Sequence, residues 1–183
     1  MKNTVKLLII SLLISTKSFG QLYATQSGET SFFSETPVEN ISAVNKTTGA
    51  IINTATSEVA ISMKMTSFEF PNKLMQEHFN ENYMESEKYP MGTFKGKIME
   101  VIDYTKNGTY DVTAKGQLTL HGVTLPRDLK GKLTVENQKI SLISSFEVKL
   151  VDYKIDIPKI VFAKIAEVIS VKTKYNFSPY VRK

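Results

Sequence analysis

Apolar and polar side chains alternate over much of the chain, and the longest such run extends from Thr109 to His121. One face of this run carries Tyr110, Val112, Ala114, Gly116, Leu118 and Leu120. A period of two over a dozen residues is typical of a β-strand with one dry face, and it excludes a helix. Gly122 interrupts the run, and a second alternating run follows from Val123 to Val135. The pattern therefore predicts a long antiparallel hairpin.

The same alternation predicts further strands along the chain. They are Glu29–Thr36, Gly49–Asn53, Ser57–Phe70, Thr93–Asp103, Leu129–Glu136, Ile140–Leu150 and Val168–Phe177. Lys106-Asn107-Gly108 has the composition of a tight hairpin turn, as does Asn137-Gln138. We interpret Val38–Asn45 as a loop or a single helical turn, because its alternation is weak.

Two segments change to helical spacing. Leu74, Met75, His78 and Phe79 share one face of Pro71–Met84. In Asp156–Ala166, Asp156 is a candidate N-cap and Pro158 falls in the first turn. We therefore predict two short helical insertions between strands.

About eight antiparallel strands with two insertions favour a closed barrel, because closure removes the exposed sheet edges. A sandwich of two sheets is the alternative. The polar strand face carries Asp111, Lys115 and Gln117, which argues against a barrel whose outside contacts lipid. We predict an all-β fold with short helical insertions, built as an antiparallel β-barrel of about eight strands.

The first 20 residues have the features of a secretory signal peptide. Lys2 and Lys6 precede the apolar run Leu7–Ile14, and small residues at Ser18 and Gly20 flank Phe19. We expect cleavage before Gln21, which leaves residues 21–183 as one domain; an uncleaved anchor is the alternative. We therefore expect a periplasmic or secreted protein without stable membrane insertion.

Composition narrows the class of partner. The formal charge of +5 falls to +2 without residues 1–20, which contain Lys2, Lys6 and Lys17 and no acidic residue. No dense basic patch with interleaved aromatic residues is present, so we do not expect a nucleic-acid partner. The chain has no cysteine, and a secreted domain without disulfides suits a bacterial periplasm.

The sequence contains no known catalytic motif. It has no nucleophile elbow, phosphate loop, dinucleotide fingerprint or cysteine nucleophile, and its two histidines lack the spacing of a metal site. We interpret His78 as a partly buried, hydrogen-bonded side chain, and His121 as a side chain that stabilises a turn. No catalytic residue, metal or cofactor is therefore predicted.

Small residues on the dry strand faces suggest a hollow interior. They occur at mid-strand positions beside large apolar side chains: Gly96, Ala114, Gly116 and Ser144. A dry cavity invites an apolar ligand. The alternative is that the glycines allow bends or bulges. Both interpretations are open at this point.

The predicted cavity lining consists of apolar side chains on the dry strand faces and the helical segments. The residues are Ile61, Met63, Phe68, Phe70, Leu74, Met75, Phe79, Phe94, Ile98, Tyr110, Val112, Ala114, Leu118, Leu120, Phe146, Val148 and Phe162. Leu74, Met75, Phe79 and Met84 are expected to form a lid over one barrel opening, since flexible methionines can repack around a ligand. A plug that completes the core is the alternative.

Three motifs carry a resemblance to a known family. They are Phe79-Asn80, then Tyr89-Pro90-x-x-Thr93-Phe94-Lys95-Gly96, and then Gly116-x-Leu118-Thr119-Leu120-His121-Gly122-Val123-Thr124-x-Pro126. In order and spacing the chain resembles the YceI-like family from about Gly28 to its C-terminus. The LTLHGVT run is the most specific of the motifs.

The resemblance implies a secreted bacterial, lipocalin-like barrel that binds a long-chain lipid or isoprenoid ligand without a cofactor. A polyisoprenoid-like or fatty-acid-like chain in the barrel interior is the expected ligand, and a homodimer is left open. Two alternatives from other classes stay open. One is a hydrolase or isomerase acting on a lipid headgroup with His121 or His78 as base, and the other is a ligand-free structural or envelope-stress protein.

Overall fold

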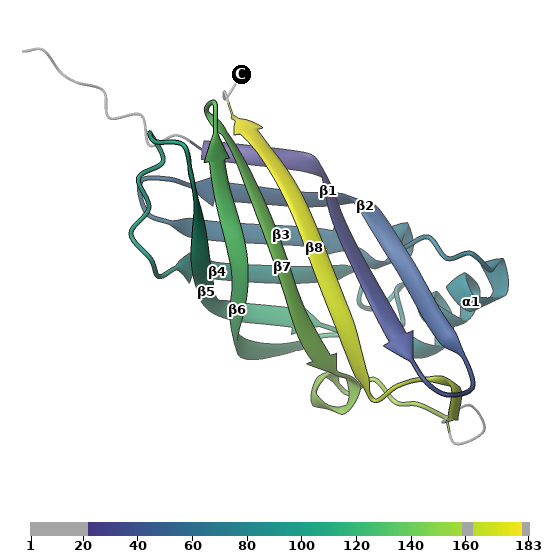
Figure 1. Ribbon diagram of the computed structural model, residues 1–183. Coiled ribbons are helices and arrows are strands. Elements are labelled where there is room, and N and C mark those ends of the chain that lie inside the picture. The colour runs from purple at the N-terminus through teal and green to yellow at the C-terminus, as the bar shows by residue number, and fades with distance from the viewer. Residues whose placement is uncertain (1–21, 159–162, 181–183) are drawn as a thin grey trace, which may run out of the picture.

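The computed structural model describes residues 22–158 and 163–180, and within them the chain forms a closed antiparallel barrel of eight strands. Each strand pairs with the next along the chain, and β8 returns to pair with β1 (Figure 1). The predicted barrel is confirmed and the sandwich is wrong. The predicted signal peptide and Phe162 lie outside the described residues.

The strands of the barrel are β1 (Leu22–Glu35), β2 (Asn40–Asn53), β3 (Glu58–Lys64), β4 (Met91–Ile98), β5 (Gly108–Leu120), β6 (Val123–Glu136), β7 (Lys139–Lys149) and β8 (Val168–Pro179). The helical turns are η1 (Met65–Ser67), α1 (Lys73–His78), the π-helical η2 (Phe79–Tyr83) and η3 (Leu150–Tyr153). These turns lie at the barrel end where β8 begins, which we call the helical end; β1 begins at the opposite, terminal end (Figure 1).

The strands with unbroken alternation form where the sequence predicts them. β5 pairs with β6 from Gly108↔Val135 to Leu120↔Val123 without a register shift. The two-residue turn between β6 and β7 has positive φ at both Asn137 (48°) and Gln138 (61°). A two-residue loop with positive φ at both positions matches the twist of the flanking strands. The predicted hairpins on both sides of β6 are therefore confirmed.

β1 and β2 are longer than predicted, and the segment Val38–Asn45 is mostly strand rather than loop. The register of the pair shifts between Thr25 and Gly28 and again between Gly28 and Thr30. At the second shift, two steps along β1 match three steps along β2, from Asn45 to Thr48. Such an extra residue is a β-bulge, and it breaks the period of two. The bulges therefore hide both strands from a pattern-based prediction.

Three other predictions need correction. β3 ends at Lys64 and turns into η1, so Ser57–Phe70 is only half strand. β4 ends at Ile98, and a connection over residues 99–107 replaces the tight turn predicted at 106–108. Within that connection Asp103 accepts a hydrogen bond from the Thr105 backbone N–H at 3.0 Å. Asp156–Pro158 are irregular rather than the start of a helix, and residues 159–162 lie outside the described range. Beyond them, only residues 163–164 form a 3₁₀ turn.

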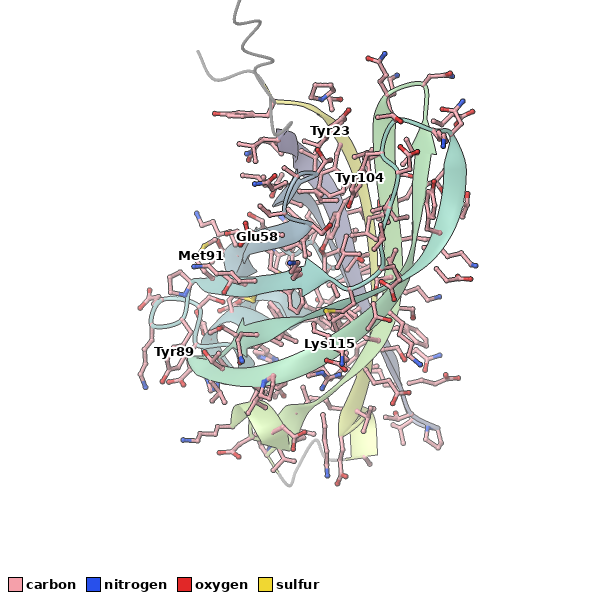
Figure 2. All side chains as sticks on the ribbon, turned by 90° about the vertical axis from the view of Figure 1, so that its left-hand side faces the viewer. Tyr23, Glu58, Tyr89, Met91, Tyr104 and Lys115 are labelled. Carbon is pink, nitrogen blue, oxygen red and sulfur yellow. The ribbon has the colours of Figure 1, made fainter. Side chains whose placement is uncertain are left out.

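The terminal end of the barrel is tightly packed. Ile52 and Leu133 are fully buried there, and Ile140 and Phe177 face each other across β7 and β8 with at most 2% exposure. Figure 2 shows Tyr23 and Tyr104 toward this end, and Tyr89 toward the helical end. None of the described helices is long and apolar enough to cross a bilayer.

Candidate functional site

Three apolar spaces follow one another from the barrel interior to the helical end. The inner void has a volume of about 40 Å³ and the middle cavity about 100 Å³. The mouth cavity, beside α1, has about 370 Å³. Ligand sites for small molecules are typically clefts of roughly 300–1,000 Å³. Only the mouth cavity reaches that range by itself.

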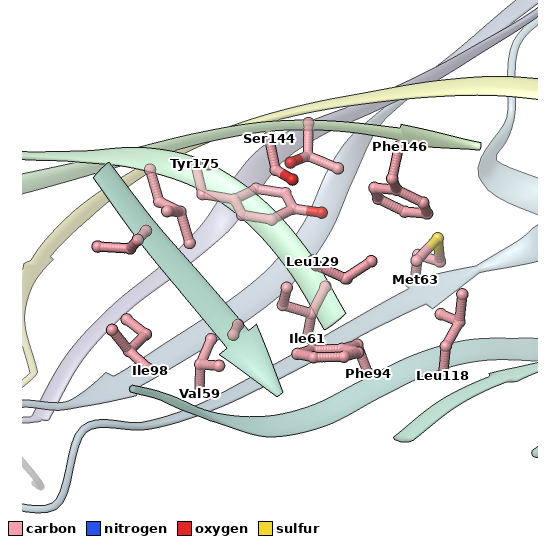
Figure 3. Close-up of a pocket in the computed structure, with 15 residues that line it drawn as sticks. Val59, Ile61, Met63, Phe94, Ile98, Leu118, Leu129, Ser144, Phe146 and Tyr175 are labelled. Atoms are coloured by element: carbon pink, nitrogen blue, oxygen red, sulfur yellow. The ribbon is translucent and has the colours of Figure 1, made fainter. Parts of the chain in front are cut away.

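The inner void lies among inward-facing side chains at mid-barrel. Figure 3 shows Phe146, Met63 and Leu118 at one end of it, and Ile98 and Val59 toward the other. Its volume is roughly a tenth of the volume of the mouth cavity. Mid-barrel is therefore nearly filled.

The mid-strand glycines do not produce this void. Gly96 and Gly116 face each other across β4 and β5. A Cβ on Gly96 would lie 2.5 Å from the Lys115 carbonyl oxygen, and one on Gly116 only 2.2 Å from that of Lys95. Neighbouring backbone fills the space, so these glycines allow a close approach of chain segments. Of the small residues noted in the sequence, only Ala114 and Ser144 line the void.

The middle cavity joins the mouth cavity through shared walls. Six side chains line both spaces: Phe32, Phe79, Met84, Leu150, Ile155 and Ile169. Met63, Leu118 and Phe146 line both the middle cavity and the inner void, so these two spaces adjoin as well. The result is an apolar channel that narrows from the helical end toward mid-barrel.

α1 and η2 cover one side of the mouth. The Asn72 side chain caps α1 by accepting a hydrogen bond from the Leu74 backbone N–H at 2.9 Å. Asn80 donates to the Gln76 carbonyl at 2.8 Å and accepts from the Ser86 hydroxyl at 2.8 Å. The Asn of the Phe79-Asn80 motif therefore fixes the insertion where it returns toward β4.

An aromatic cluster forms the wall between the insertion and β1. The Phe79 ring stacks on Phe32 with centroids 5.5 Å apart, and it contacts Phe68 and Phe70 at 5.7 and 5.1 Å. These rings are large apolar surfaces with defined geometry. They hold η2 against the barrel while Leu74, on α1, stays 56% exposed.

Polar groups occur at the edge of the mouth cavity. The Lys164 Nζ lies 3.6 Å from the Glu39 Oε2, and both residues line the cavity. The Ala166 backbone N–H donates to the Ser34 hydroxyl at 2.9 Å. Burial raises the pKa of the Tyr83 phenol, which lines the same cavity. The site therefore has an apolar interior and a polar entrance.

A small polar cluster lies beside the apolar channel. The Thr30 hydroxyl is 2.8 Å from the Tyr175 hydroxyl and 3.1 Å from that of Thr48. Burial raises the pKa of Tyr175 to about 12. The cluster satisfies its own hydrogen-bonding groups, as buried polar groups require.

Most residues of the predicted cavity lining lie on one of the three spaces. Ile61, Phe94, Ile98, Val112 and Ala114 line the inner void, with the shared Met63, Leu118 and Phe146. Phe68, Leu120 and Val148 line the middle cavity, and Phe70, Leu74 and Met75 the mouth cavity, with Phe79 shared. Tyr110 lines none of them. Phe162 lies outside the described residues.

Sequence reasoning missed one wall of the channel. It is formed by Phe32 on β1, Ile169 and Val171 on β8, and Leu150 and Ile155 beside η3. Ile169 and Val171 alternate within the predicted strand Val168–Phe177, so parity alone could have placed them inside. Strand alternation shows which residues face the barrel interior. It does not show which of them line a cavity, because the packing of the loops decides that.

The two histidines differ in their surroundings. The His121 imidazole is only 9% exposed; its Nε2 lies 2.8 Å from the Glu85 Oε2, and its Nδ1 3.1 Å from the Tyr153 carbonyl oxygen. It lies at the β5–β6 turn and lines none of the three spaces, which agrees with a structural role. His78 lines the mouth cavity, but it is exposed and has no hydrogen bond or ion pair among the described residues. The prediction of a partly buried, hydrogen-bonded His78 is therefore wrong.

Comparison with known proteins decides the family. The model of the YceI-like domain matches residues 21–177. The chain belongs to the YceI-like family. No curated protein matches the chain.

Solved structures share the fold of this YceI-like chain at low identity. A polyisoprenoid binding domain from Saccharophagus degradans, implicated in plant cell wall breakdown, has 13% identity and a TM-score of 0.75, covering 87% of this chain and 98% of its own. Burkholderia cenocepacia BcnA has 14% identity and a TM-score of 0.68, with coverages of 82% and 96%. The Campylobacter jejuni YCEI protein has 16% identity and a TM-score of 0.56, with coverages of 99% and 92%.

The motif residues of the YceI-like chain have structural explanations in this barrel. Gly122 has a φ of 71°, and a Cβ there would lie 2.5 Å from the Tyr89 ring. Tyr89 in turn packs edge-on against His121, with ring centroids 4.6 Å apart. Tyr89 therefore packs against both His121 and Gly122, and this contact connects the end of the helical insertion to the β5–β6 turn.

Proposed function

We propose that this YceI-like protein binds a long-chain apolar or amphiphilic lipid, without catalysis, in the cell envelope. The observation that carries the proposal is the continuous apolar channel from the mouth cavity to the middle cavity. Transfer of a hydrocarbon chain from water into such an apolar space is favourable, by roughly 25 cal/mol per Å² of apolar surface that becomes buried. The family and the likeness to the polyisoprenoid binding domain from Saccharophagus degradans support an isoprenoid-like chain, and a fatty-acid-like chain would fit the same apolar walls.

The polar entrance gives the ligand a direction. The Glu39–Lys164 pair and the Ser34 hydroxyl lie at the mouth, whereas the walls further in are Phe, Met, Leu, Ile and Val side chains with the single hydroxyl of Thr30. Burying an unpaired polar headgroup in the channel would cost free energy. The hydrocarbon end therefore enters first and the headgroup stays at the mouth. A periplasmic or secreted location is part of the proposal, and the signal-like sequence of residues 1–20 supports it.

A pair of lysine substitutions on β8 tests the proposal. Val171 lines the middle cavity, while its neighbour Ser170 is exposed on the outer face. With delipidated protein and a fluorescent fatty acid as probe, Val171→Lys should weaken binding at least about tenfold, because a charge in the channel opposes the chain. Ser170→Lys is the matched control and should bind as the unchanged protein does.

Two results would count against the proposal. One is equal binding by both lysine variants, and the other is the absence of saturable binding by the unchanged protein. Organic extraction of protein purified from its own host, followed by mass spectrometry, should in addition release a lipid.

A further inference from the structure

The channel ends inside the barrel, and this limits the length of chain that it can hold. Beyond the middle cavity stand Met63, Leu118 and Phe146, then the inner void of about 40 Å³, and then the packed terminal end. Resting on the proposed function, we infer that the ligand is a single chain of about 15–20 carbons and that Phe146 is the stop that sets this length.

The volumes supply the length. A cavity of about 150 Å³ holds benzene, which corresponds to about 25 Å³ for each carbon. At that density the mouth cavity of about 370 Å³ and the middle cavity of about 100 Å³ together hold on the order of 15–20 carbons. This space fits one fatty acyl chain or a short isoprenoid. It excludes lipids with two long chains and polyisoprenoids of several tens of carbons.

Phe146 is the rigid member of the constriction. Figure 3 shows its ring near Met63 at the end of the inner void, with Leu118 on the same side. Met63 is unbranched and adapts its shape, whereas an aromatic ring has only two side-chain torsions and no alternative shape. Phe146 is paired with Val171 across β7 and β8, so its backbone is held by the sheet. A chain end that reaches this ring finds beyond it only the inner void of about 40 Å³, the smallest of the three spaces.

If Phe146 limits the chain, affinity should rise with chain length only up to a certain number of carbons. We call this chain length the break. Each CH₂ group that becomes buried is worth roughly a fourfold gain in affinity. For straight-chain fatty acids from about 10 to about 24 carbons, affinity should therefore rise steeply and then level off or fall beyond about 15–20 carbons. Competition against a fluorescent fatty acid measures this curve directly.

Phe146→Ala should move the break. Removing the ring frees about as much space as six carbons occupy and joins the middle cavity to the inner void. We expect the break to shift upward by about four to six carbons. Phe146→Leu, which keeps an apolar side chain and most of the packing, should shift it by about half as much and serves if the alanine variant folds poorly.

Phe70→Ala is the matched control, because it removes the same ring from the mouth cavity. It should lower the affinity for every chain length and leave the break in place, because the added space lies at the mouth, where the headgroup stays, and not beyond the end of the chain.

The outcomes separate this inference from the proposed function. If the unchanged protein binds none of the fatty acids and none of a series of isoprenoid alcohols, the proposed function fails. If it binds chains but prefers those far longer than about 20 carbons, or if neither Phe146 variant moves the break, the proposed function stands and the stop is wrong. A shift with Phe146→Ala and none with Phe70→Ala supports the stop.

Discussion

The two ends of the barrel are built from the same eight strands of the described chain, yet one end is packed and the other is hollow. At the terminal end, Ile52, Leu133 and Phe177 are buried with at most 1% exposure. At the helical end, the same strands surround the middle and mouth cavities. The difference lies in what connects the strands, because long insertions at the helical end cover the opening instead of filling it.

Close packing and ligand binding make opposite demands on a core. Protein interiors normally reach the density of organic crystals, and each void loses van der Waals contacts. The terminal end satisfies this demand and holds the strands in register, and the helical end can then stay open. In the polar cluster, Thr30 lines the middle cavity and its hydrogen-bond partner Tyr175 lines the inner void.

Truncating one leucine at each end of the barrel tests whether the two ends differ in packing. Leu133→Ala should lower the free energy of unfolding by about 2–5 kcal/mol, because Leu133 is fully buried in the packed end. Leu120→Ala should lower it by less than about half as much, because Leu120 is only partly buried and already borders the middle cavity. Denaturant unfolding measures both. Equal losses would mean that the helical end is packed as tightly as the terminal end.

The insertion gives the second comparison, between a lid and a plug. In the double variant Met75→Ala, Phe79→Ala, a lid predicts faster loss of bound lipid with a stability loss of only about 1–2 kcal/mol, since part of that face meets ligand. A plug predicts that each truncation costs about 2–5 kcal/mol. Glu77→Ala, on the exposed side of α1, is the control and should change neither quantity. Unchanged lipid release from a well-folded double variant would contradict the lid.

The two histidines extend the comparison to the loops. His121→Ala removes two hydrogen bonds that tie the β5–β6 turn to Glu85 and Tyr153, so we expect a stability loss of about 1–3 kcal/mol. His78→Ala should leave stability within about 0.5 kcal/mol, because His78 is exposed and has no such partner among the described residues. Thermal and denaturant unfolding of the two variants test this difference. A larger loss for His78→Ala would reverse the assignment.

The last comparison concerns pH, and its effect is confined to strongly alkaline solution. Tyr175 has a pKa of about 12 in the folded protein, above the ordinary value of 10.0, because burial disfavours the phenolate. The folded state therefore keeps this proton more strongly, and the resulting stability is fully present below about pH 10 and lost as the pH rises through about 12. Phenolate absorbance and unfolding curves across that range measure both. Tyr175→Phe should remove the pH-dependent step, and its persistence would assign the step to another group.

The sequence predicts the regular part of this barrel and not its irregular part. β5, β6 and β7 keep an unbroken period of two, so their bounds and pairing follow from parity alone. β1 and β2 contain bulges that shift the alternation midway. The strand propensities of their residues do not reveal where the bulges lie.

The sequence does not locate the main cavity. Small mid-strand residues predict a hollow at mid-barrel, but neighbouring backbone fills the space beside Gly96 and Gly116. The larger space lies at the helical end, where it depends on how the insertion settles against Phe32 and Ile169. Long-range packing of loops sets this arrangement, and no local pattern encodes it.

The most direct test of the central claim is a crystal structure of the protein purified from its own host without added lipid. We expect continuous, chain-shaped density that starts at the Glu39–Lys164 edge, passes Phe32 and Ile169, and ends at Phe146. The terminal end should contain side chains only. A helical end whose cavities are filled by protein side chains, or a chain that crosses into the terminal end, would contradict it.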